Sequence, residues 1–223
     1  LVPCAKLLTT SGLRRLEQLA VGGSTVYLSW FAGSTPEQRG SWLPGLGPLL
    51  GIRPLGRYGL ASTRANGELT LRLVAPLGDL AAGDVLQFRL PHDRDARTYL
   101  PVEPDGAEVL TVDPAGRPAL LRRAHGAGTF VFATDPLEHL AARTPDVNPE
   151  DCWRLYAALA GAAGVRRPVR VDDPRVVAGR ICTGRGGRAI VVNCSFDPIE
   201  AAVHADHASD AVAPDRLTLE PCG

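Results

Sequence analysis

Cysteine and histidine are the residues of this sequence that most readily do nucleophilic or metal chemistry. The cysteines are odd in number and include no C-x-x-C pair: Cys4, Cys152, Cys182, Cys194 and Cys222. This spacing argues against a structural zinc site and against a disulfide framework. We therefore expect buried, reduced thiols in a cytoplasmic protein, with no metal and no cofactor.

Two short segments deserve testing as sites. His204, Asp206 and His207 are metal-ligand types, but no fourth ligand lies nearby in the sequence, so we expect a solvated loop. Cys194 has no neighbouring histidine or cation to activate it, so we expect a buried structural thiol. Asn193-Cys194-Ser195 fits a glycosylation sequon, which a cytoplasmic protein does not use.

Glycoside cleavage needs two carboxyl groups held on either side of a sugar. Glutamates of the right type are present, but nothing in their spacing pairs them: Glu103, Glu108, Glu138 and Glu150. The sequence therefore names no catalytic residue.

Aromatic residues form the remaining candidate site. Trp30 and Phe31 follow a predicted strand, at the strand end where open α/β sheets place ligand clefts. Trp42 lies in a loop rich in glycine and proline. Aromatic rings stack on sugar faces and also anchor interfaces, so Trp30, Phe31 and Trp42 are candidate substrate-binding residues, with simple core packing as the alternative.

The first 33 residues must position this site. Leu1 and Val2 look like the end of a buried strand. Thr9 to Ser11 offer hydroxyls that can cap a helix, and Leu13, Leu16, Leu19 and Ala20 recur at helical spacing. Gly22-Gly23 ends the helix, and residues 25–29 read as a second strand. Strand, helix and strand this close together predict a crossover in a parallel sheet.

The middle of the chain predicts an antiparallel excursion within an α/β frame. Residues 68–74 and 84–90 alternate as half-buried strands do, and residues 107–112 and 118–122 form a predicted hairpin. Residues 129–133 read as a strand covered on both faces. Asn148-Pro149 starts a helix, and one face of it is predicted to be lined by Trp153, Tyr156, Leu159 and Ala160. Leu43 to Leu50 predict a short helix that Gly47-Pro48 breaks or kinks. Gly126 and Gly128 read as a turn rather than a phosphate loop.

From residue 168 the pattern is entirely β, with a hairpin turn at residues 184–187. We expect two domains, residues 1–165 and 166–223, the second a small β-sandwich. The chain begins within a predicted strand, contains no methionine and stops where another strand is expected. These features predict a fragment with a truncated first domain and a missing last strand.

Composition excludes some partners. The 223 residues carry 24 basic and 24 acidic side chains, so no net charge favours nucleic acid or an anionic membrane. No apolar run approaches the roughly 18 residues that a membrane-spanning helix requires.

Several segments together resemble one family: LVPCAKLLT, LEQLAVGGSTVYLSWFAG and GRPALLRRAHGAGTFVFATDPLE in the first domain, and VVNCSFDPIEAAVH and LTLEPCG in the tail. They resemble the region after the catalytic barrel in bacterial β-galactosidases and β-mannosidase-type glycosidases. The resemblance implies a trimerisation domain with a class I glutamine amidotransferase-like, or flavodoxin-like, fold and a small C-terminal β-domain. It also implies that both catalytic glutamates belong to a barrel that this chain lacks.

Amidotransferase chemistry requires a cysteine on a sharp strand-to-helix turn and a histidine to activate it. Here the matching turn reads Ser29 to Gly33, and Phe31 stands about where the nucleophile would be. The family's H-P-E motif corresponds loosely to Asp135-Pro136-Leu137-Glu138, without histidine. The sequence therefore predicts a retained fold and a lost activity.

We expect a non-catalytic, oligomerising part of a glycoside hydrolase that acts on β-linked sugars and shapes the substrate cleft. Its expected partners are the catalytic barrel of the same polypeptide, further copies in a trimer or dimer, and carbohydrate. The alternatives are a sugar-binding module that uses Trp30 and Trp42, or a divergent thiol hydrolase that uses Cys4 or Cys194.

Overall fold

The structure is a computed structural model of the 223-residue chain. It describes residues 1–2, 8–30, 46–55, 62–63, 68–89, 98–138, 149–183, 186–205 and 216–221. The chain divides into two compact units, Leu1–Ala163 (unit 1) and Gly164–Gly223 (unit 2), and each is considered by itself.

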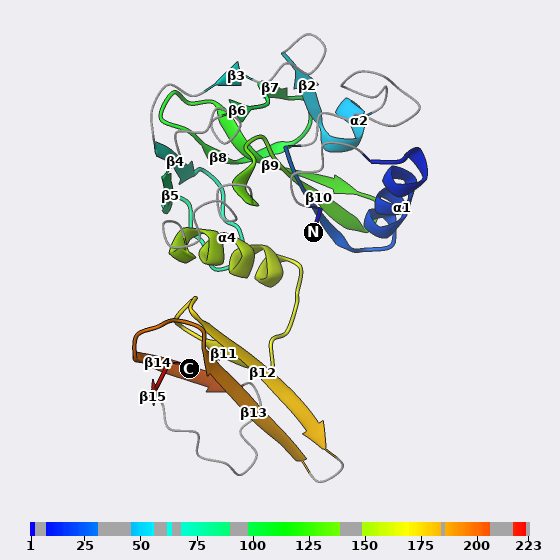
Figure 1. Cartoon of the computed structure of the whole chain (residues 1–223). Coiled ribbons are helices and arrows are strands. Elements are labelled where there is room, and N and C mark those ends of the chain that lie inside the picture. Colours follow the sequence, from blue (N-terminus) through cyan, green and yellow to red (C-terminus); the bar gives the residue numbers. More distant parts are fainter. Residues whose placement is uncertain are drawn as a thin grey trace. The chain divides into compact units, whose positions relative to one another are not determined.

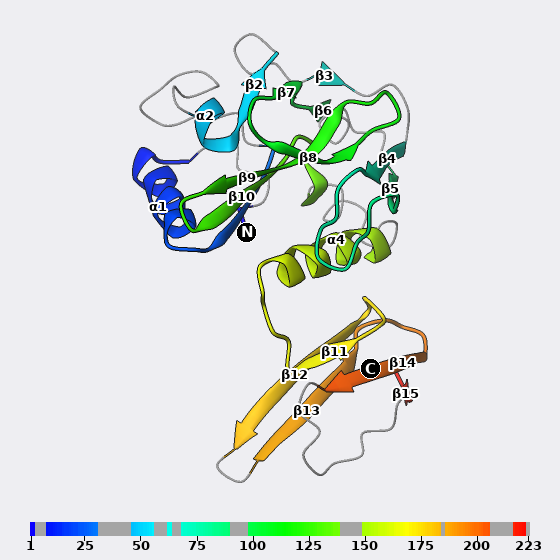
Figure 2. The same ribbon diagram turned by 180° about the vertical axis from the view of Figure 1, so that it is seen from behind.

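Unit 1 is built on a six-stranded mixed sheet (Figures 1 and 2). Its strands, in spatial order, are β1 (Thr25–Ser29), β10 (Gly128–Ala133), β9 (Pro118–His125), β8 (Glu108–Val112), β4 (Glu68–Leu73) and β5 (Val85–Arg89). β1 and β10 run parallel, whereas every other neighbouring pair in this sheet is antiparallel. The predicted antiparallel excursion is therefore part of the same sheet as the predicted parallel strands.

Two short antiparallel pairs and three helices complete the described part of unit 1. They are β2 (Ile52–Pro54) with β7 (Val102–Pro104), β3 (Ser62–Thr63) with β6 (Thr98–Tyr99), α1 (Thr10–Val21), α2 (Leu46–Leu50) and α4 (Pro149–Ala162).

The strand–helix–strand prediction for the start of the chain is confirmed. Val2 forms a parallel bridge with Leu28 of β1, and α1 connects the two segments. The side chain of Thr9 caps α1 by accepting a hydrogen bond from the N–H of Gly12 at 3.0 Å, which satisfies one of the free donors of the first turn. Gly22 caps the other end.

Alternate residues of β10 enter two different cores. Phe130 and Phe132 pack in one cluster with buried residues of α1 and α2, and Val131 and Ala133 pack in another with buried residues of α4. Successive side chains of a strand point to opposite faces, so the sheet is covered on both sides, as predicted from the continuous apolar run. All four side chains are at most 1% exposed.

The Gly126-x-Gly128 prediction is also confirmed as a turn between β9 and β10. Gly126 has φ +61°, which favours glycine. A Cβ on Gly128 would lie 2.3 Å from the carbonyl oxygen of Ser24 and 2.4 Å from that of Ala20. The second glycine therefore permits the close approach of β10 to the end of α1.

Two helix predictions need correction. Gly47-Pro48 does not break α2 but lies inside it. The N–H groups of the first helical turn have no intrahelical acceptor, so a proline there loses no hydrogen bond by lacking its N–H. In α4 the fully buried residues are Leu155, Ala158 and Leu159, so the core-facing stripe is displaced from the predicted one of Trp153, Tyr156, Leu159 and Ala160.

Unit 2 consists of short antiparallel strands. β11 (Val169–Val171), β14 (Ile199–Ala205) and β15 (Arg216–Leu219) form one sheet, and β12 (Val176–Thr183) and β13 (Gly186–Asn193) form a two-stranded hairpin. Among its described residues, the buried hydrophobic cluster consists of Val176, Ile199 and Ala201, with Val171, Val191 and Leu219 packed partly against it.

Candidate functional site

The carboxyl end of β1 holds the most unusual backbone of the described chain. Ser29 ends the strand and is fully buried, and the N–H of Trp30 donates to the carbonyl oxygen of Ala133 at 2.8 Å. Trp30 has φ +47° and is the only non-glycine residue with positive φ among the described residues. A bulky residue held in this region costs about 1–3 kcal/mol, so the surrounding contacts must enforce the turn.

The segment that follows β10 reaches the same place. Thr134 and Asp135 are buried, and the Thr134 hydroxyl donates to Oδ2 of Asp135 at 3.0 Å. Leu137 and Glu138 then begin a helical stretch. Because β1 and β10 are parallel and Ser29 lies opposite Ala133, both segments leave the sheet at one edge.

Glu138 links three parts of unit 1. One of its carboxylate oxygens accepts a hydrogen bond from the hydroxyl of Ser29, and the other accepts one from the hydroxyl of Tyr156 in α4. The ring of Tyr156 also meets the ring of Tyr27 edge to face, with centroids 6.2 Å apart. We call Ser29, Glu138 and Tyr156 the carboxylate network.

The network lies where the resemblance places the amidotransferase residues. The turn at Ser29-Trp30 and the segment Asp135 to Glu138, matched above to the nucleophile turn and to H-P-E, are in direct contact through Glu138. Tyr156 was missed as a network member, since its position in an apolar helix predicts core packing.

The geometry does not present an activated nucleophile. Ser29 is 0% exposed, so a substrate does not reach its hydroxyl. The one histidine described in unit 1, His125, lies opposite Gly128 at the other end of β10 and approaches Glu17, with Nε2 and Oε1 3.4 Å apart. In the described chain, the carboxylate network is thus a hydrogen-bonded tie between segments.

The other glutamates considered as glycosidase acids have separate partners. Glu103 pairs with Arg53, and Glu108 pairs with Arg122 with N and O atoms 2.7 Å apart. Both are surface ion pairs, and the side chain of Glu150 lies outside the described residues. Each of the three described candidates is thus bonded to a different group.

Of the three aromatic candidates, only Trp30 lies within the described residues. Its side chain is half-buried against the cluster that contains Leu28 and Phe132. Phe31 and Trp42 lie outside the described residues. The strained position observed at the turn is Trp30, one residue before the position assigned from the sequence.

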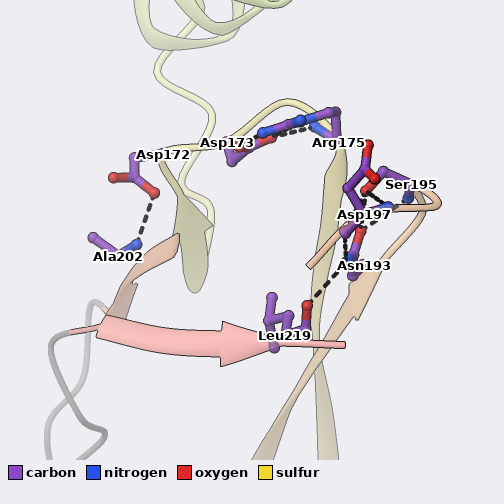
Figure 3. Close-up of polar contacts among 8 residues, drawn as sticks. All are labelled: Asp172, Asp173, Arg175, Asn193, Ser195, Asp197, Ala202 and Leu219. Carbon is purple, nitrogen blue, oxygen red and sulfur yellow. Dashed lines mark hydrogen bonds and ion pairs between the residues drawn. The ribbon is translucent and has the colours of Figure 1, made fainter. Parts of the chain in front are cut away.

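Asn193 organises the turn that leaves β13 in unit 2 (Figure 3). Its Nδ2 donates to the carbonyl oxygens of Asp197 at 2.8 Å and Leu219 at 3.0 Å, and its Oδ1 accepts from the N–H and hydroxyl of Ser195. The amide is 2% exposed with both ends occupied, which leaves no nitrogen for a glycan.

The prediction of buried thiols is wrong for Cys182 and Cys194, which are free and exposed. Cys194 follows the inward-pointing Asn193, so its side chain turns outward. Cys182 pairs with Gly187 near the hairpin turn, whereas the buried pair Val176 and Asn193 lies at the other end. The side chains of the remaining cysteines lie outside the described residues.

The described residues contain neither a cluster of metal-ligating side chains nor a membrane-spanning helix. No group of three or more metal-ligating side chains occurs there. His204 is exposed, while Asp206 and His207 lie outside the described residues. No helix in the part of the chain described is long and apolar enough to cross a membrane.

No protein-family model matches the chain, and no curated protein matches it. Solved structures do. A β-galactosidase from Rahnella sp. R3 covers 98% of this chain with a TM-score of 0.67 and 16% identity. The chain has the fold of part of a β-galactosidase. The β-galactosidase from Bacillus circulans sp. alkalophilus covers 90% of this chain, with a TM-score of 0.62 and 17% identity. The β-galactosidase from Halorubrum lacusprofundi covers 99% of this chain, with a TM-score of 0.59 and 21% identity.

The share of each solved chain is small. This chain spans 30%, 27% and 30% of the three β-galactosidase chains, respectively. At these identities the similarity is one of fold. The resemblance found from sequence motifs therefore agrees with the structural neighbours, which include a GH42 β-galactosidase.

Proposed function

We propose that the chain is a non-catalytic accessory region of a glycoside hydrolase that acts on β-linked sugars. The observation that carries this proposal is a structural match that includes nearly the whole of this chain, with residues of both units. The matched part is 30% of the length of each of two β-galactosidase chains. A match of such extent favours a fold shared along the whole chain over a single shared local motif. The catalytic glutamates would then belong to a barrel elsewhere in the polypeptide.

The carboxylate network supports the absence of chemistry in unit 1. A thiol hydrolase needs an accessible sulfur beside a base, whereas the turn after β1 carries Trp30 beside the buried Ser29. We infer a class I glutamine amidotransferase-like, flavodoxin-like fold, because β1 ends in a left-handed residue, Trp30, one position before the residue assigned to the nucleophile of that fold.

The finer parts of the proposal concern assembly and substrate. Unit 1 acts as a trimerisation-type domain in a homo-oligomer in the cytoplasm, and its Trp30 edge lies near the barrel mouth. Trp30, Phe31 and Trp42 then contact sugar. The strained backbone of Trp30 supports this role, since strained residues cluster at functional sites.

Activity assays test the proposal. The 223-residue chain is expected to hydrolyse neither aryl β-galactosides nor glutamine, while the polypeptide that includes the barrel hydrolyses the galactosides. Turnover of either substrate by the chain alone would overturn the non-catalytic role. Light scattering of the active polypeptide should give an oligomer, and a strict monomer would contradict the assembly role.

The thiol-hydrolase alternative has its own test. Among the described residues, the contact recorded for the Cys194 sulfur is the carbonyl oxygen of Val192 at 3.8 Å, and no hydrogen bond joins it to a histidine. Iodoacetamide should therefore label Cys194 at the rate of an ordinary exposed thiol. Labelling far faster than that of Cys182 would favour the alternative.

A further inference from the structure

Unit 2 carries an apolar surface on the side of its hairpin that faces away from its core. Strand alternation places the exposed Arg188 directly opposite Ile181, on the face of β12 and β13 that is opposite Val176 and Asn193. The exposed apolar residues of that face are Val177, Ile181 and Ile190. Their exposures are 60%, 52% and 46%. We call these three residues the outer hairpin face.

Gly179 keeps this face open at its centre. It lies between Val177 and Ile181 along β12 and opposite Ile190 of β13. A Cβ built on Gly179 meets nothing within 4 Å. The face therefore has room for side chains that belong to another surface.

A rigid loop presents an aromatic ring at the end of the hairpin where Val177 lies. Phe196 is 96% exposed. The loop around it is fixed by the four hydrogen bonds of the Asn193 amide (Figure 3). In addition, the N–H of Cys194 donates to the carbonyl oxygen of Arg175 at 2.9 Å. A pre-organised, exposed aromatic of this kind is the usual anchor of a protein interface.

We propose that the outer hairpin face and Phe196 dock on the remaining part of the same polypeptide, the part that the longer β-galactosidase chains have and this chain does not. This inference rests on the proposed function. Unit 2 has few fully buried hydrophobic residues of its own among those described, so apolar area that it exposes is available to a partner.

The small area of this surface favours a partner in the same polypeptide over a second copy of the chain. Phenylalanine exposes about 200 Å² and the three half-exposed aliphatic side chains about 50 Å² each, a total of roughly 350 Å². A stable two-chain interface needs about 800 Å² from each partner. A segment of the same chain meets the surface at a high effective concentration, so a smaller area suffices.

The experiment measures thiol labelling in the polypeptide that carries both the barrel and this chain. An Ile190→Cys variant is treated with a maleimide, and mass spectrometry follows its labelled peptide against that of native Cys182, which is exposed on the other face of the hairpin. The labelling rate of each thiol is divided by the rate of the same thiol in urea. On this scale, we expect the cysteine of Ile190→Cys to react about tenfold more slowly than Cys182. Equal rates would overturn the proposal, as would equal protection of both thiols.

A second variant shows what covers the face. Gly179→Lys has space in unit 2 but fills the docked surface with a charge, so it should return the labelling of Ile190→Cys to the rate of Cys182. Protection that Gly179→Lys leaves unchanged counts against docking on this face. Protection lost on dilution means that a second copy covers the face, and it rejects the tethered partner.

Glycosidase activity of the same polypeptide separates this inference from the proposed function. Activity without protection of Ile190→Cys rejects the docking alone. Protection without activity rejects the glycosidase role and leaves the docking surface standing.

Discussion

Units 1 and 2 both expose some large hydrophobic side chains, but they differ in the size of the hydrophobic core that each has. In unit 1 both faces of the sheet are covered, and β10 supplies side chains to two separate cores. In the part of unit 2 that the structure describes, the buried hydrophobic cluster has three residues, while the outer hairpin face and Phe196 are exposed. The difference teaches that the described part of unit 1 covers much of its apolar surface internally, whereas the docking proposed above would cover the apolar surface that unit 2 exposes.

The largest expected effect is a core truncation in unit 1. Phe130→Ala removes a ring that is 0% exposed between β10 and the α1 side of the sheet. We expect a loss of about 3–5 kcal/mol in the free energy of unfolding, since the cavity adds to the lost transfer energy. Urea denaturation measures it, with the partly exposed Leu19→Ala as the matched control. A loss below 1 kcal/mol would mean that the two-core description is wrong.

A truncation in unit 2 should cost less and act on that unit alone. Ile199→Ala is expected to destabilise by about 2–3 kcal/mol, at the low end for this substitution because a small core relaxes more easily. Hydrogen exchange of β11 to β15 should accelerate while that of β1 and β10 stays unchanged. The control is Ile181→Ala, on the outer hairpin face. Equal acceleration in both units would show that they unfold as one.

The carboxylate network should contribute an intermediate amount. Glu138→Gln keeps the shape but weakens the acceptors for Ser29 and Tyr156, and we expect a loss of about 1–3 kcal/mol in unit 1. Tyr156→Phe removes one of the two bonds and should lose about half as much. Thermal unfolding compares the two variants. If Glu138→Gln is neutral, the network does not hold the edge of the sheet.

The smallest effect concerns pH and unit 2. The side-chain hydrogen bond from Arg175 is the main cause that lowers the pKa of Asp173 below its usual value. Because the folded-state pKa is the lower one, this stabilisation is present above the unfolded pKa near 3.8 and is lost as pH falls through the folded value. Asp173→Asn should therefore cost under about 1 kcal/mol at pH 7 and less at an acid pH below the folded pKa of Asp173. The same cost at both pH values would contradict the ion pair.

Local patterns in the sequence predicted local structure well. The strand at 25–29 and the capped helix before it are confirmed, because glycines on both sides isolate a β-branched run and Thr9 supplies the cap. The hairpin of β12 and β13 is confirmed for the same kind of reason, since alternation and a glycine-rich turn are both local.

Contacts between distant residues were not predictable. Nothing near Glu138 in the sequence indicates that it meets Ser29 and Tyr156, and an apolar helix hides the role of the tyrosine. Sequence also gave no sign of which thiols are exposed, because Cys194 is turned outward by the hydrogen bonds of Asn193 rather than by its own surroundings. The candidate site was thus foreseen as a turn lacking a nucleophile, but not as a carboxylate tie.

The carboxylate network also sets an order of events during translation. Ser29 and Glu138 are separated by 109 residues, and the third member lies further along, in α4. When β1 leaves the ribosome, Glu138 and Tyr156 have not yet been synthesised, so Ser29 lacks its partners in the network. Unit 1 therefore closes late, when the first residues of unit 2 are already entering the exit tunnel.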